Sequence, residues 1–154
     1  MRLMHSRFGL VMVSAVAAAA LVACGGGEAG GKSEGGSAGG GAAAGGKVEV
    51  TLSEWAVKSN VAKAKAGTVE FVTTNKGATA HELVVYQTDT AADKLAQAGG
   101  VADEKQVTVI GRTASLDANK SETKKFELKA GKYLLVCNLP AHYQQGMRAA
   151  FTVE

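Results

Sequence analysis

The chain has 154 residues, with 17 Lys and Arg, 14 Asp and Glu, and a formal net charge of +3. From residue 47 onward, 14 basic side chains face 12 acidic ones, so the charge is nearly balanced. No basic stripe or aromatic platform accompanies this charge, and nucleic acid is therefore not expected as a partner. The length after residue 46 suits one small domain.

The first 23 residues are predicted to be a secretory signal. Arg2 and Arg7 precede an apolar run at 8–22, which is short for a membrane span of about 20 residues. The run ends in Leu-Val-Ala-Cys24, which resembles a bacterial lipobox. The resemblance implies a diacylglyceryl thioether on Cys24 and an exported protein, lipid-anchored on the periplasmic or extracytoplasmic side of the envelope. The alternative is an ordinary signal followed by a chance Cys.

Residues 24–46 combine the lipidated Cys24 with a tract of Gly, Ala, Ser and a few charges. Such a composition buries too little apolar surface to offset its ordering entropy, so we expect a flexible linker. As a Gly-rich coil, it has a root-mean-square span of roughly 25 Å. The folded domain is then expected to be residues 47–154.

Short strands with Gly and Asn turns dominate residues 47–154, which predicts an all-β, Greek-key β-sandwich. Residues 89–105 are the exception, because the segment Ala91–Gln97 has a helix-forming composition. We predict a loop insertion there with a short helix. The expected strands are Val48–Leu52, Val69–Val72, His81–Tyr86, Val107–Ile110, Thr123–Lys129, Tyr133–Cys137 and Ala149–Val153.

The segment from Cys137 to Met147 carries the functional signal, because it spaces a thiol, an imidazole and a thioether as C-x4-H-x4-M. With a second histidine, these donors form the ligand set of a blue-copper site: two His and one Cys in a plane, with a weak axial Met. After removal of the signal, His81 and His142 are the only histidines and Met147 is the only methionine. Cys137 is the only thiol besides Cys24, and an unoccupied thiol is a hazard in an exported protein.

Each donor taken singly has a simpler explanation. His81 could be a surface or core histidine, Met147 a gap-filling core residue, His142 a loop residue and Cys137 a buried structural cysteine. Their order and spacing together favour the metal site.

The stretch Gly131–Met147 (GKYLLVCNLPAHYQQGM) resembles the C-terminal loop of the cupredoxins, the plastocyanin/azurin superfamily. The segment 75–85 (NKGATAHELVV) is similar to the one that carries the first histidine, most closely as in sulfocyanin-like proteins. The resemblance implies a cupredoxin domain with one type 1 copper. It implies His81 and His142 as imidazole ligands, Cys137 as thiolate ligand and Met147 as axial ligand.

Two positions depart from the family pattern. Many cupredoxins follow the first histidine with Asn or Ser, whose side chain ties the ligand loops together, whereas this chain has Glu82. The backbone N–H of Glu82 is still expected to donate to the Cys137 sulfur. Many relatives have Gly before the loop histidine, where this chain has Ala141. Neither departure removes a ligand.

The remaining aromatic residues have less specific roles. Tyr133 is predicted to pack in the core with its hydroxyl bonded, and Trp55 to be a packing residue rather than an electron relay. Apolar side chains around His142 match the patch through which cupredoxins dock partners; they are Leu139, Pro140, Ala141 and Ala149.

The expected function is a monomeric, membrane-tethered carrier of single electrons between exported or membrane redox proteins. One alternative is copper buffering or delivery, although such sites are usually exposed and rich in Met or His. Another is a metal-free interaction module, which would normally have lost ligands. An enzyme is not expected, because multicopper oxidases and copper nitrite reductases need further histidines, and binuclear copper centres need a second cysteine.

Overall fold

The computed structural model describes residues 46–154. The predicted signal at 1–23, the predicted lipidation site Cys24 and the part of the predicted linker before Gly46 lie outside the described residues. Within the described part, no helix has the length and apolar character needed to cross a membrane.

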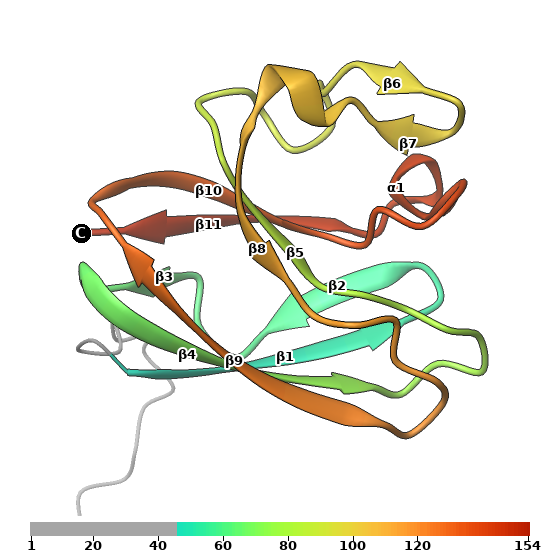
Figure 1. Ribbon diagram of the computed structural model, residues 1–154, viewed down its shortest axis with the longest axis horizontal. Helices are drawn as coiled ribbons and strands as arrows, with labels where there is room; N and C mark the ends of the chain where they lie inside the picture. The colour runs from blue at the N-terminus through green and yellow to red at the C-terminus, as the bar shows by residue number, and fades with distance from the viewer. Residues whose placement is uncertain (1–45) are drawn as a thin grey trace, which may run out of the picture. The chain divides into compact units, whose positions relative to one another are not determined.

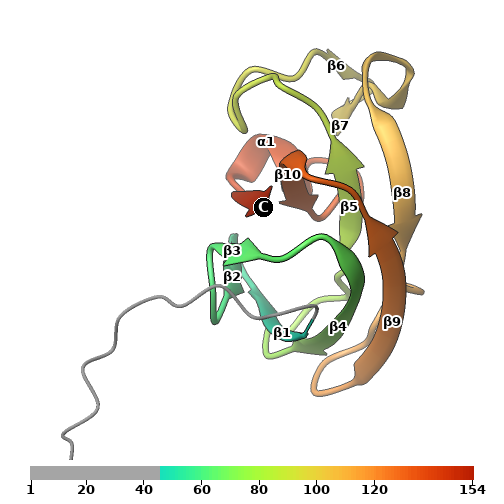
Figure 2. The ribbon, with the colours of Figure 1, turned by 90° about the vertical axis from the view of Figure 1, so that its left-hand side faces the viewer.

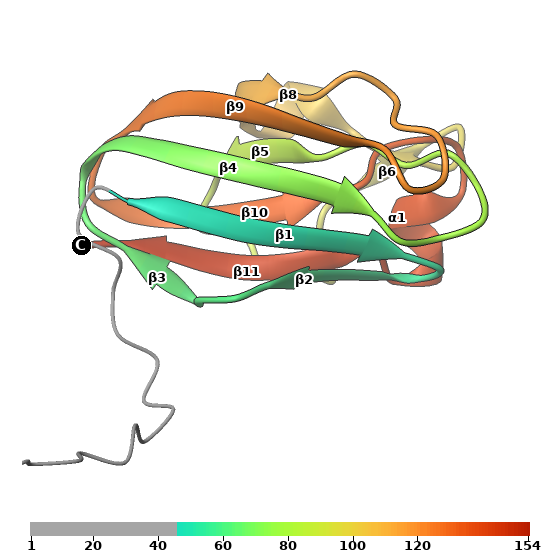
Figure 3. The same cartoon turned by 90° about the horizontal axis from the view of Figure 1, so that it is seen from below.

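The described residues form two β-sheets that face each other as the layers of a sandwich (Figure 1). The first sheet has the order β2-β1-β4-β9, in which β1 and β4 are parallel and the other neighbours antiparallel. Figure 3 shows this sheet in front of the second one. Its strands are β1 (Lys47–Ser53), β2 (Ala56–Ser59), β4 (Gly67–Asn75) and β9 (Ser121–Leu128).

The second sheet has the order β3-β11-β10-β5-β8, with β3 and β11 parallel and the other neighbours antiparallel. The chain crosses between the sheets several times, and the predicted all-β sandwich is confirmed. The strands of this sheet are β3 (Lys63–Ala64), β5 (Val84–Gln87), β8 (Thr108–Arg112), β10 (Gly131–Val136) and β11 (Arg148–Val153).

Strand β10 is buried on both faces, which explains its continuous apolar sequence. Tyr133 and Leu135 point into the core between the sheets, together with Cys137, which directly follows the strand. Leu134 and Val136 point to the outer face, where a second apolar cluster forms. The Tyr133 hydroxyl donates to the carbonyl of Lys129 at 2.8 Å, so its predicted role as a bonded core residue is confirmed.

The second cluster is covered by residues 88–107, which we call the insertion. It contains a two-stranded ribbon and a 3-10 helix in place of the predicted helix at Ala91–Gln97 (Figure 2). The helix prediction was therefore wrong in position. Its elements are β6 (Gln97–Ala98), β7 (Val101–Ala102) and the 3-10 helix η1 (Glu104–Gln106).

Tertiary contacts explain why residues 91–97 are not helical. The carbonyl of Ala92 accepts a hydrogen bond from the Tyr143 hydroxyl at 2.7 Å, and the Leu95 N–H donates to the same hydroxyl at 3.1 Å. Leu95 is 5% exposed and packs in the outer cluster. These bonds hold the backbone groups that a helix would pair internally, so the local helix preference is overridden.

Candidate metal centre

Three predicted donors lie on one loop at the end of the sandwich. Cys137 follows β10, His142 begins the one-turn helix α1 (His142–Gln145), and Met147 precedes β11. The loop is closed at its base, because the Cys137 N–H donates to the Met147 carbonyl at 3.0 Å and the Met147 N–H donates to the His142 carbonyl at 3.1 Å. The apolar strands on either side therefore fix where the loop begins and ends.

The fourth donor, His81, comes from the connection between β4 and β5. Its backbone forms an isolated bridge with Leu116, in which the His81 N–H donates at 3.1 Å and the His81 carbonyl accepts at 2.7 Å. Asn75, fully buried at the end of β4, donates to the carbonyls of Thr79 and Leu116 at 2.7 and 2.8 Å. Its side-chain oxygen accepts from the Gly77 N–H at 2.8 Å. One buried amide thus shapes the loop that delivers His81.

The donor atoms of His81, Cys137 and His142 all lie within 4.8 Å of one another. The two Nδ1 atoms are 3.1 Å apart, and the Cys137 sulfur is 3.9 Å from Nδ1 of His81 and 3.3 Å from Nδ1 of His142. His81 and Cys137 are fully buried, whereas His142 is half-buried. Met147, also fully buried, belongs to the same core cluster as Cys137.

Burial favours the neutral forms of Cys137 and His142. It raises the pKa of the Cys137 thiol, although the Glu82 N–H partly opposes this. Burial and the neighbouring His81 lower the pKa of His142, so its imidazole is neutral near pH 7. A metal ion that displaces the thiol proton would form a bond to the thiolate, and this bond would offset the free-energy cost of burying the thiolate charge.

Glu82 has two separate roles at the centre. Its backbone N–H donates to the Cys137 sulfur at 3.4 Å, which confirms that sequence prediction. Burial raises the pKa of its carboxyl group, and Arg112, with Nη1 3.8 Å away, opposes the rise. The backbone N–H of Asn138 also favours the charged form. The carboxyl group of Glu82 thus faces Arg112 and the backbone of Asn138.

Asn138, the residue after Cys137, connects the ligand loop to the insertion. Its side-chain oxygen accepts from the Ala102 N–H at 2.7 Å, and its amide donates to Glu104 at 3.1 Å. Burial alone would raise the pKa of Glu104, but hydrogen bonds from Tyr86, Arg112 and Asn138 outweigh it and hold the pKa below its ordinary value. The insertion thus stabilises the loop that carries Cys137, His142 and Met147 through a charged, hydrogen-bonded cluster.

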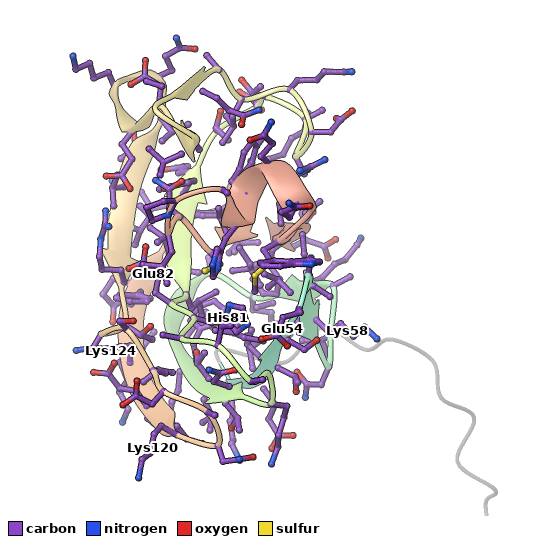
Figure 4. The ribbon with its side chains drawn as sticks, turned by 90° about the vertical axis from the view of Figure 1, so that its right-hand side faces the viewer. Glu54, Lys58, His81, Glu82, Lys120 and Lys124 are labelled. Atoms are coloured by element: carbon purple, nitrogen blue, oxygen red, sulfur yellow. The ribbon has the colours of Figure 1, made fainter. Side chains whose placement is uncertain are left out.

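Glu54 is a residue of the centre that sequence reasoning missed. Its Oε1 lies 3.3 Å from Nε2 of His81, and Figure 4 shows the two residues next to each other. The same oxygen accepts from the N–H groups of Ala78 and Thr79 at 2.9 and 2.8 Å and from the Thr79 hydroxyl at 2.9 Å. The bond from the Thr79 backbone is the main reason that the pKa of Glu54 falls to about 2. No spacing motif connects Glu54 with His81, so the sequence offered no signal.

Two residues set the surroundings of His142. The Trp55 indole meets its ring edge-on, with centroids 5.2 Å apart, and is 43% exposed. Trp55 therefore packs against a metal-site histidine, and its role as a packing residue rather than an electron relay stays a prediction. Ala141 has φ 67°, in the left-handed region that favours glycine, which accounts for the Gly that many relatives have there.

The donor set fits copper. A largely buried thiol and two imidazoles that converge on one point, with the Met147 thioether in the same core cluster as Cys137, suit copper better than the hard cations, which take oxygen ligands. Bound in such a site, copper supplies a one-electron redox couple. The residues present would hold it with His81, Cys137, His142 and Met147.

The model for copper-binding proteins of the plastocyanin/azurin family matches residues 42–154. Auracyanin from Roseiflexus castenholzii is 24% identical, with a TM-score of 0.56 over 73% of this chain and 98% of its own. Auracyanin A from Chloroflexus aurantiacus is 22% identical, with a TM-score of 0.51 over 70% of this chain and 98% of its own. Rusticyanin from Thiobacillus ferrooxidans is 18% identical, with a TM-score of 0.50 over 70% of this chain and 76% of its own.

At these identities the solved structures establish the fold, and no curated protein matches the chain. The similarity to sulfocyanin-like proteins stays a prediction. The family match, by contrast, spans the whole sandwich and includes every donor of the centre. The chain belongs to the plastocyanin/azurin family of copper-binding proteins, the cupredoxins, and its donors match a single type 1 copper site.

Proposed function

We propose that this cupredoxin is a membrane-tethered carrier of single electrons between exported redox proteins. The observation that supports this most is the convergence of the His81, Cys137 and His142 donor atoms within 4.8 Å of one another. Donors that the surrounding hydrogen bonds hold in place need little rearrangement when copper changes oxidation state. Small rearrangement permits fast electron transfer.

The bonds around the donors support the same function. Asn75 holds the His81 loop, Asn138 ties the Cys137 loop to the insertion, and Glu82 donates to the sulfur. A protein that hands copper to a partner needs a site that opens, whereas these bonds resist opening. Copper buffering or delivery is therefore the less favoured function.

One experiment separates the two. Cu(II) is added to the purified protein, and the visible and EPR spectra are recorded. The expected result is an intense thiolate-to-copper absorption with a reversible one-electron potential. The electron self-exchange rate is then compared with the rate at which Cu(I) passes to a chelator. A carrier exchanges electrons many times before it loses its metal. Faster metal loss than electron exchange would favour delivery.

The tether rests on the Leu-Val-Ala-Cys24 sequence and the Gly-rich segment after it. Expression in a bacterium grown with labelled palmitate should yield a labelled protein in the membrane fraction. Cys24→Ser should abolish the label and release the protein from the membrane. An unlabelled wild-type protein would contradict the lipid anchor and leave the copper function untouched.

The proposed partners are exported or membrane redox proteins that donate and accept electrons, and the carrier is proposed to act as a monomer. Support comes from the half-buried His142, which is the donor with access to solvent. Pro140 and Ala141 beside it are exposed, and Leu139 is half-buried. An apolar rim of this kind allows close approach of a partner to the copper ligand.

A further inference from the structure

Glu54 lies in the turn between β1 and β2, far in sequence from the ligand that it contacts. Its Oε1 is 3.3 Å from Nε2 of His81, and the His81 side chain is completely buried. The Glu54 side chain is 29% exposed. The carboxylate therefore stands between solvent and the buried imidazole, at the ring nitrogen that does not face the other donors.

The other partners of Glu54 hold the carboxylate in this position. Two backbone N–H groups and the Thr79 hydroxyl donate to the same oxygen that faces His81. All three donors belong to the loop that carries His81. Because hydrogen bonds to the ionised form favour it, the carboxylate keeps its negative charge. Glu54 thus presents a fixed negative charge to His81.

Gly77 provides the space for this contact. A Cβ at Gly77 would lie 2.6 and 2.7 Å from the two carboxylate oxygens of Glu54 and 2.7 Å from Nε2 of His81. Separations this short are essentially never seen for real Cβ atoms, so another residue here would displace the Glu54 carboxylate, the His81 ring or both. Glycine allows the three groups to approach closely.

The contact determines which ring nitrogen is free to bind metal. A carboxylate can only accept, so it places the imidazole proton on Nε2. The lone pair of Nδ1 then points toward Cys137 and His142. A carboxylate partner also makes a metal-bound imidazole more basic. Its charge stabilises Cu(II), the more highly charged oxidation state, more than Cu(I).

We propose that Glu54 is a positioning residue of the copper centre: it holds His81 with Nδ1 toward the metal, and its charge lowers the reduction potential. The inference rests on the copper site of the proposed function, and it adds a specific control of Cu(II) affinity and potential. The other carboxyl group near the donors, Glu82, lies toward Arg112 and does not contact the His81 ring within the described hydrogen bonds.

The test compares Glu54→Gln with the wild-type protein. All the contacts converge on one oxygen, so the amide oxygen of Gln can accept the same hydrogen bonds without the charge. We expect the thiolate-to-copper absorption to remain. The reduction potential should rise, and the dissociation constant for Cu(II) should increase about 10-fold. The measurements are redox titration and competition with a chelator.

Glu49→Gln is the matched control, because it removes the same charge from the exposed face of β1. If Glu54→Gln changes potential and affinity no more than Glu49→Gln does, the inference is wrong. If the wild-type protein shows no type 1 spectrum, the proposed function fails instead, so the two failures are distinguishable.

Gly77→Ala is a second variant for the case in which Glu54→Gln does not fold. The added methyl group separates Glu54 from His81 and leaves the net charge unchanged, so we expect the same direction of both changes. In the metal-free protein, NMR should also show loss of the Nε2–H tautomer of His81 in this variant. An unchanged tautomer with unchanged potential would overturn the proposal.

Discussion

The Trp55 indole and the His142 imidazole meet edge-on, with ring centroids 5.2 Å apart and an angle of 81° between their planes. The His142 ring also lies 5.0 Å from the ring of His81. His142, the donor with access to solvent, thus contacts both an exposed aromatic ring and a buried ligand. The partner surface proposed above therefore includes Trp55.

Ala141→Lys should slow electron exchange with partner proteins and with a second copy of the protein. The exposed charge would stand beside His142 and oppose close apolar contact, while the Cys137 bond that gives the colour is untouched. Stopped-flow kinetics and the visible spectrum measure the two effects. Ala150→Lys, on the exposed part of β11, is the control and should leave the rates near those of wild type. Equal rates in both variants would show that electrons do not pass to partners through the surface around His142.

Cys137→Ser should abolish the blue or green colour of the Cu(II) protein, because no other thiolate lies among the donors. The fold should persist, as judged by circular dichroism, since serine is close to cysteine in size. Cys24→Ser removes the other cysteine and should keep the colour. Colour in the Cys137 variant would disprove the assignment of this ligand.

Met147→Leu should keep the colour and raise the reduction potential. Loss of an electron-donating axial ligand disfavours Cu(II) more than Cu(I). Leucine has nearly the volume of the fully buried methionine, so the core should tolerate it. Leu128→Met, at the end of β9, is a core control that should not change the potential. A potential that stays constant or falls in Met147→Leu would show that another group is axial.

Ala141→Gly should stabilise the domain. An L-residue with φ 67° is strained, and glycine removes the strain at some cost in unfolded-state entropy. We expect a net gain of about 0.5–1 kcal/mol in the free energy of unfolding, measured by urea denaturation of the metal-free protein. Asn119→Gly, at φ 63°, is the comparison and should gain less, because Asn tolerates this region. A loss of stability in Ala141→Gly would contradict the strain.

Glu104→Gln should reduce stability at neutral pH and have less effect in acid. The folded pKa of Glu104 lies below its ordinary value of 4.5, so its ionised form contributes stability above about pH 4.5. That contribution is lost as the pH falls through the folded pKa. The difference between variant and wild type, measured by urea unfolding from pH 7 to pH 3, should therefore shrink. A difference that is constant with pH would exclude the linkage.

Local sequence patterns predicted most of the sandwich and the four donors. The strand residues alternate or form buried runs, and the donor spacing C-x4-H-x4-M lies within one loop, so both signals are short in range. β3 was missed, because its two residues are held by parallel pairing with β11 at the far end of the chain. The helix at 91–97 was predicted from composition, but the Tyr143 hydroxyl takes its backbone groups.

Contacts between distant segments limited the prediction of the site. Glu54 is 27 positions from His81 and reaches it only because β1 pairs in parallel with β4, whose end carries the His81 loop. The same holds for Asn138 and Glu104, which meet when the insertion folds over the second sheet. The ligands could be named from the sequence, whereas the groups that orient them depend on the folded topology.

The direction of β1 has a consequence for the geometry of a tethered carrier. β1 starts at Lys47, opposite Glu70, and runs toward Leu52, opposite Asn75 at the copper end (Figure 3). The chain therefore enters the domain at the end of the sandwich opposite the copper site. If the proposed lipid is attached before this point, it would hold the domain at the end opposite the copper and would leave the copper end toward the proposed partner.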